Sequence, residues 1–290
     1  MKKICGLTVS LFLVLSISIL IGLSSSGYAK SKGAFVTDYP PVKSPEHEIW
    51  RSLMMKNKFL EILSEGLNQI ITIPGIVTIT ARECGGVNAY YQRAGGPLGE
   101  LVMCYELLDD FQQLFSQYYP DPEMQGKMVM GAWTFVFLHE MGHALIDQLD
   151  LPITGREEDA VDQLSTVLLT QAGASGEIAA LGGAQWFRLG SARYRDPSGV
   201  WLKNLFGEEH YNFSDEHSIQ EQRFYNILCW LYGYNPEAYA AAVKDGTLPA
   251  QRAPRCGREY QQMARTWEKL LNPYMNQRPQ FIKPSNSASR

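Results

Sequence analysis

The spacing of apolar residues predicts strands in the first part of the chain and helices in the rest. β-Branched and alternating stretches predict strands at residues 34–37, 70–80, 87–91 and 98–105. The second of these is expected to bend at Pro74-Gly75, and Gly95-Gly96-Pro97 predicts a hairpin turn between the last two. One helix is expected from about Glu46 to Asn68, and helices dominate after residue 105.

A strongly apolar segment lies at the centre of the chain. Residues 133–138 and 144–146 are apolar and flank His139-Glu140-Met141-Gly142-His143. Such a segment is typical of a helix that runs through the interior of a domain. The polar residues inside it need partners, because an unpaired buried polar group costs on the order of several kcal/mol. A divalent cation would satisfy all of them together.

The spacing of these polar residues is that of a zinc site. Positions i and i+4 of a helix share a face, so His139 and His143 can converge on one cation. Glu140 then lies beside the cation, where it can take a proton from a zinc-bound water whose pKa is lowered to around 7. The five-residue pattern also occurs by chance in ordinary surface helices. The apolar surroundings favour the zinc interpretation.

A third ligand is expected from the acidic stretch that follows. A catalytic zinc usually takes three protein ligands, and Glu157-Glu158-Asp159 opens a second predicted helix. Glu158 and Asp162 are i and i+4, so one can bind the metal while the other accepts the free N–H of a ligating histidine. Glu157 and Asp159 compete for the ligand role. The helix macrodipole alone would favour acids in the first turn, but it does not explain Asp162.

H-E-x-x-H followed by E-x-x-x-D resembles the motif of the gluzincin, or thermolysin-like, peptidases. Carried across, the resemblance implies that His139, His143 and Glu158 are ligands of Zn2+, that Glu140 is the general base, and that Asp162 orients a ligating histidine.

Longer stretches of the chain resemble a more specific family. The blocks FVFLHEMGHALIDQLDLPITGREEDAVDQLS, ECGGVNAYY, LVMCYELL and EQRFYNILCWLYG are similar to a bacterial family of exported zinc metallopeptidases known mainly from sequence. This resemblance implies the fold and the metal more firmly than the substrate.

Peptide hydrolysis also needs a donor to the oxyanion and a place for the substrate backbone. In thermolysin-like enzymes a downstream histidine donates, usually with a tyrosine. His217 is the candidate here, with Tyr225 or Tyr232 as helper, although His210 could do the same work and a lone loop histidine is often only solvated. Zinc peptidases commonly bind substrate along a sheet edge. Residues 98–105 are the candidate edge strand, and a plain core strand is the alternative.

The N-terminus predicts export. Lys2-Lys3, an apolar run over residues 4–23 and small residues at Gly27 and Ala29 are typical of a secretory signal at residues 1–29. An uncleaved membrane anchor is the alternative, since the run is near the length that spans a bilayer. Loss of the two lysines changes the formal net charge from −4 to −6. An acidic mature chain argues against nucleic acid or an anionic membrane as its main partner.

The cysteines agree with export to the periplasm or the exterior. Cys84, Cys104, Cys229 and Cys256 follow the predicted signal, and an even number in an oxidising compartment predicts two disulfides. Proximity along the chain favours Cys84 with Cys104 and Cys229 with Cys256. Cysteine ligation of zinc competes with this interpretation, but the chain has no C-x-x-C pair.

We therefore expect one α+β, zincin-like domain at residues 30–290. Residues 30–155 should hold a small mixed or mainly antiparallel sheet packed on the HExxH helix, and residues 156–290 a mostly helical lobe. We expect His47 at the surface and a loose tail after Pro273.

The function that these features predict is a zinc-dependent peptidase that acts on peptide or protein substrates, without a stable membrane anchor after signal cleavage. An exported, non-catalytic zinc-containing binding protein is one alternative, although it would not need Glu140. A zinc amidase that acts on cell-wall amide bonds is the other.

Overall fold

The computed structural model describes residues 33–194 and 218–276. The strands are β1 (Ala34–Asp38), β2 (Ile76–Arg82), β3 (Ala89–Gly95) and β4 (Leu98–Cys104). The helices are α2 (Pro45–Lys56), α3 (Phe59–Ile70), α4 (Tyr105–Tyr118), α5 (Pro122–Leu149), α6 (Glu157–Gln171), α7 (Gly173–Tyr194), α9 (Gln220–Tyr234), α10 (Ala240–Lys244) and α11 (Ala253–Leu271). The predicted α+β class is confirmed. Within the described part of the chain, no helix is long and apolar enough to cross a membrane.

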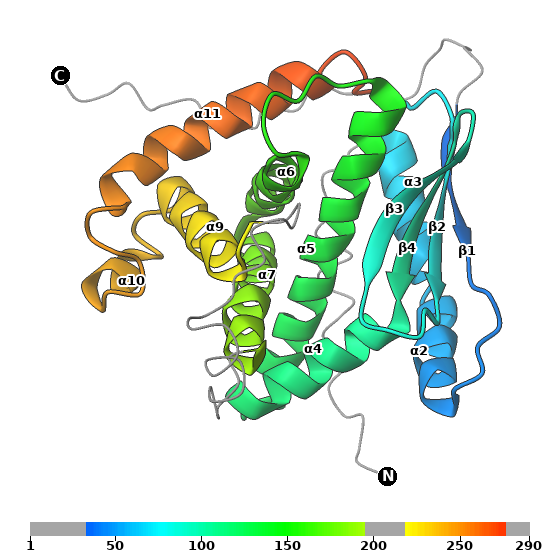
Figure 1. The fold of residues 1–290 in the computed structure, drawn as a ribbon, viewed down its shortest axis with the longest axis horizontal. Helices are drawn as coiled ribbons and strands as arrows, with labels where there is room; N and C mark the ends of the chain where they lie inside the picture. The colour runs from blue at the N-terminus through cyan, green and yellow to red at the C-terminus, as the bar shows by residue number, and fades with distance from the viewer. Residues whose placement is uncertain (1–32, 195–217, 277–290) are drawn as a thin grey trace, which may run out of the picture.

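The long helix α5 lies between the sheet and the remaining C-terminal helices (Figure 1). Its centre is apolar all round, and Trp133, Phe135 and Phe137 are at most 1% exposed. One side packs on β3 and β4, and the other packs on α6 and α7. Asp121 caps the N-terminus by accepting from the Met124 backbone N–H at 3.1 Å. The apolar run therefore forms a core helix, as its sequence predicts.

The sheet is mixed, with the strand order β1-β2-β4-β3. β1 is parallel to β2 and β2 is parallel to β4, whereas β3 pairs antiparallel with β4. The predicted hairpin is thus confirmed. The assignment of residues 98–105 as the edge strand is wrong, because β4 lies between β2 and β3. Its run Leu101-Val102-Met103 is fully buried, as is typical of an interior strand. The edge next to α5 is β3.

Two predicted elements near the N-terminus are shorter in the structure. The single helix expected over residues 46–68 is divided into α2 and α3, because Lys58 adopts a left-handed conformation with φ 50°. The expected strand over 70–80 begins only at Ile76. Before it, Ile71 makes a single antiparallel bridge with Met275.

That bridge also corrects the expectation of a loose tail immediately after Pro273. The Thr72 backbone N–H donates to the Tyr274 carbonyl at 2.9 Å, and the Asn276 N–H donates to the Ile70 carbonyl at 2.8 Å. Backbone groups at residues 70–72 therefore have their hydrogen-bond partners in the C-terminal segment. These bonds hold residues 274–276 against the chain that leads into β2.

His47 is not a surface residue, since its side chain is only 12% exposed. Its Nδ1 lies 2.9 Å from Glu83 Oε1 and its Nε2 lies 3.0 Å from Asp109 Oδ2. Trp50 also donates to Asp109, at 2.8 Å. The polar pattern of the first turn of α2 indicated a surface position, but His47 binds Glu83, directly after β2, and Asp109 on α4.

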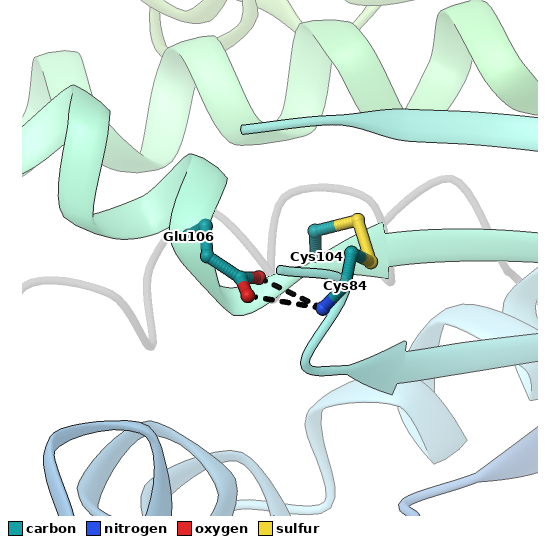
Figure 2. A group of neighbouring side chains, drawn as sticks. All are labelled: Cys84, Cys104 and Glu106. Carbon is teal, nitrogen blue, oxygen red and sulfur yellow. Dashed lines mark hydrogen bonds between the residues drawn. A yellow bond between two sulfur atoms is a disulfide. The ribbon is translucent and has the colours of Figure 1, made fainter. Parts of the chain in front are cut away.

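Two disulfides join Cys84 to Cys104 and Cys229 to Cys256. Cys84 follows β2 and Cys104 ends β4, so the first disulfide links the ends of two neighbouring parallel strands and not the two arms of the hairpin. Figure 2 shows Glu106 beside this bond, accepting from the Cys84 backbone N–H at 3.0 Å. The sulfurs are bonded to each other, so the group is a connection between strand ends and not a metal site. The second disulfide joins α9 to α11.

Candidate metal centre

Helices α5 and α6 bring the candidate ligands together. His139, Glu140 and His143 lie on α5, and α6 starts at Glu157 after a short turn. Gly142 allows the two helices to approach closely, since a Cβ at this position would lie 2.7 Å from Val161 Cγ1. The glycine within the H-E-x-x-H motif therefore places the first turn of α6 next to both histidines.

The inward nitrogens of both histidines meet the carboxylate of Glu158. His139 Nε2 lies 3.0 Å from Glu158 Oε2, and His143 Nε2 lies 3.2 Å from Glu158 Oε1. The two Nε2 atoms are 3.3 Å apart. His139, His143 and Glu158 each offer a ligand atom, and these three atoms lie within 4.8 Å of one another. The three residues could hold a metal ion.

The outward nitrogens are held by two other acids. His139 Nδ1 lies 2.9 Å from Asp162 Oδ1, and His143 Nδ1 lies 2.7 Å from Glu157 Oε1. Glu157 thus contacts the opposite side of an imidazole from Glu158. Asp159, the other competitor for the ligand role, accepts a hydrogen bond from Ser218 Oγ at 2.6 Å. Among these three acids, Glu158 is the one that meets both Nε2 atoms.

The chemistry of this donor set fits a cation. A carboxylate accepts hydrogen bonds, so each neutral imidazole carries its proton on Nδ1 and presents a lone pair at Nε2. Two lone pairs and two carboxylate oxygens then converge on one point, which is unfavourable unless positive charge lies between them. Imidazole nitrogen and carboxylate oxygen are ligands that zinc accepts.

The pKa shifts of the two histidines also indicate that the site favours positive charge. Burial lowers the pKa of His139, but its hydrogen bonds to Asp162 and Glu158 outweigh burial, so the net shift of the pKa is upward. Burial likewise lowers the pKa of His143, and Glu158 and Glu157 outweigh it and raise the pKa to about 9. The acids around both imidazoles therefore favour positive charge at this place, whether from a proton or from a metal ion.

Arg223 is a component of the site that sequence analysis missed. From α9, its Nε donates to Asp162 Oδ2 and its terminal nitrogen to Asp162 Oδ1, each at 2.7 Å. Its guanidinium lies 3.8 Å from the centre of the Phe187 ring. Burial alone would raise the pKa of Asp162, but Arg223 and His139 lower it to about 2. Arg223 is the single basic residue in the block EQRFYNILCWLYG, and this is the signal that could have identified it.

Glu140 is buried beside the ligands and faces the sheet. Its residue is 7% exposed. Burial raises the pKa of its carboxyl, and the two histidines partly offset this effect. The backbone N–H of Tyr91, on β3, is near the same carboxyl and lowers its pKa, the smallest of these influences. The edge strand therefore reaches the candidate general base, a contact that the sequence did not reveal.

The residues predicted to stabilise the oxyanion are only partly described by the structure. His217 and His210 lie outside the described residues. Tyr225 is 40% exposed and stacks edge-on against Phe224. Tyr232 packs against the hydrophobic core. The oxyanion donor thus stays a prediction.

An α+β fold in which two helical histidines and a following carboxylate face one point is an arrangement typical of metal-dependent hydrolases. A family model described as "Putative metallopeptidase" matches residues 39–271. The chain belongs to this family. No curated protein and no solved structure matches it.

Proposed function

We propose that this protein is a zinc-dependent peptidase in which His139, His143 and Glu158 bind the metal and Glu140 is the general base. The observation that carries the proposal is the convergence of both Nε2 atoms and the Glu158 carboxylate, with Nε2–Oε distances of 3.0 and 3.2 Å. Family membership supports the peptidase class. Two disulfides support an exported protein.

A zinc ion bound at these residues would polarise a water molecule and the substrate carbonyl, and would lower the pKa of the water towards about 7. Glu140 is placed to take the proton of the attacking water and to pass it to the leaving amine. Burial raises the pKa of this carboxyl, which makes it a stronger base than an ordinary glutamate.

The surrounding residues fix the ligands in place. Asp162 holds His139, Arg223 holds Asp162, and Glu157 holds His143 through hydrogen bonds of 2.7 to 2.9 Å. Such partners set the tautomer and ring orientation of a ligating histidine. The position of Glu158 at the Nε2 atoms and of Asp162 at Nδ1 supports the gluzincin-like assignment.

A peptide substrate would bind along β3. This strand is an edge of the sheet and packs on α5, and extended peptides commonly bind by adding a strand to such an edge. We propose His217 as the oxyanion donor on the strength of the family resemblance alone.

The decisive variant is Glu140→Gln. It removes the base but keeps the size and polarity of the side chain, so zinc content should stay at one equivalent while cleavage of a peptide library is abolished.

Mass spectrometry of the products of the wild-type protein identifies the bond that is cleaved. Peptide termini support a peptidase, whereas sugar-linked or single amino-acid fragments support the cell-wall amidase. Cleavage that continues unchanged in Glu140→Gln would refute the proposal. A wild-type protein that holds zinc but cleaves nothing would favour the non-catalytic binding protein.

A further inference from the structure

A third polar residue continues the line of the two histidines on α5. His139, His143 and Asp147 are spaced four apart, so they follow one side of the helix. The Asp147 carboxylate accepts a hydrogen bond from Tyr91 Oη at 2.6 Å and forms an ion pair with Arg93. Tyr91 and Arg93 are both on β3. The helix that carries the metal site is therefore tied to the edge strand one turn after His143.

Neighbouring residues on α5 and β4 hold the Tyr91 side chain in the position that contacts Asp147. Gln148 Nε2 donates to Tyr91 Oη at 3.2 Å. The ring lies over Gly99 of β4, where a Cβ would come within 2.5 Å of Tyr91 Oη. Burial, followed by the hydrogen bond to Asp147, raises the pKa of Tyr91 to about 12. The hydroxyl therefore stays protonated and donates to Asp147 at any physiological pH.

The same residue contacts α5 at a second point. While the side chain of Tyr91 binds Asp147, its backbone N–H lies near the Glu140 carboxyl. β3 has a strand neighbour on one side only, and its residues 92–95 are exposed. The contacts of Tyr91 with α5 thus hold a strand that the sheet itself holds from one side.

We propose that Tyr91 is a positioning residue: its bond to Asp147 fixes β3 against α5 at the level of Glu140, and so sets the orientation of this carboxylate relative to a substrate strand. This inference rests on the proposed peptidase function. The metal ligands come from α5 and α6, whereas the Tyr91–Asp147 contact joins α5 to β3. Loss of the contact should therefore lower kcat and leave zinc affinity and KM nearly unchanged.

The chain offers a matched control in the neighbouring Tyr90. Successive residues of a strand point to opposite faces, and the hydroxyl of Tyr90 binds Arg82 rather than α5. Tyr91→Phe and Tyr90→Phe remove the same atom from adjacent positions. In zinc-free protein, hydrogen exchange of the backbone amides at 89–95 should be about tenfold faster in Tyr91→Phe than in Tyr90→Phe, the scale of one lost hydrogen bond to a charged group.

In the zinc-loaded protein, kcat for a cleaved peptide should fall about tenfold in Tyr91→Phe, with the zinc dissociation constant within about twofold of wild type and Tyr90→Phe unaffected. Asp147→Ala should reproduce both effects. Equal exchange in the two phenylalanine variants would overturn the proposal, and so would faster exchange with an unchanged kcat. A wild-type protein that cleaves no peptide would contradict the proposed function instead. The exchange measurement would still decide whether Tyr91 holds β3 against α5.

Discussion

The two sides of α5 are built differently. Towards α6 and α9, buried charges hold the candidate ligands, and Asp162 and Arg223 are 2% and 9% exposed. Towards the sheet, the partly exposed strand β3 meets the helix through Tyr91, Arg93 and Asp147. Buried charged contacts are costly to break, whereas partly exposed ones contribute less. The difference suggests that metal binding and substrate positioning can be changed separately.

The largest effect is expected on the ligand side, from Glu158→Gln. An amide supplies no negative charge to the cation, and its NH2 group would meet one of the two Nε2 atoms. Zinc affinity should fall by more than the roughly 10- to 100-fold typical of residues that only orient ligands. A competition titration with a chelating dye measures this, with Glu157→Gln as the matched control. A smaller loss for Glu158→Gln than for Glu157→Gln would reverse their assigned roles.

Arg223→Gln should have the next largest effect. It leaves Asp162 buried without its cation, which costs about 3–5 kcal/mol of unfolding free energy, and it loosens His139, so zinc affinity should fall by about 10- to 100-fold. Arg252→Gln is the control, because the Arg252–Glu259 pair is about a third exposed and is expected to contribute at most about 1 kcal/mol. Chemical denaturation and zinc titration of both variants test the contrast. Equal losses would show that burial does not distinguish the two arginines.

A change of pH alters the charge of the site without replacing any residue. In metal-free protein the pKa of His143 is raised from 6.5 to about 9, so this histidine carries a proton below that pH and zinc must displace it. Apparent zinc affinity should therefore fall by about tenfold for each unit from pH 8 to pH 6 for each proton displaced. Titrations across this interval measure the slope. A zinc affinity independent of pH would show that neither imidazole is protonated in the metal-free site.

The local part of the site could be predicted from sequence, and the long-range part could not. His139, Glu140 and His143 lie within one helical turn, so their spacing alone places them together. The choice among the acids at 157–159 depends on how α6 packs on α5 at Gly142 and Val161, which spacing does not reveal. Arg223 contacts Asp162 across 61 positions of the chain, beyond any local pattern.

The fold shows the same limit. The hairpin and β1 follow from alternation and turn residues, but the parallel pairing of β2 with β4 places the expected edge strand inside the sheet. The break at Lys58 is equally hidden, because a lysine carries no signal for a left-handed conformation. The predicted start of the second strand at residue 70 was wrong for a related reason. Residues 71 and 72 bind a segment about 200 positions away instead of the sheet.

The central claim is that His139, His143 and Glu158 jointly hold one zinc ion. Anomalous diffraction at the zinc absorption edge, from crystals of tag-free protein loaded with one equivalent of zinc, tests it most directly. The account predicts one strong peak bounded by both Nε2 atoms and the Glu158 carboxylate, at about 2.0–2.2 Å from each ligand atom. A zinc peak elsewhere, or one that Glu157 or Asp159 completes in place of Glu158, would contradict it.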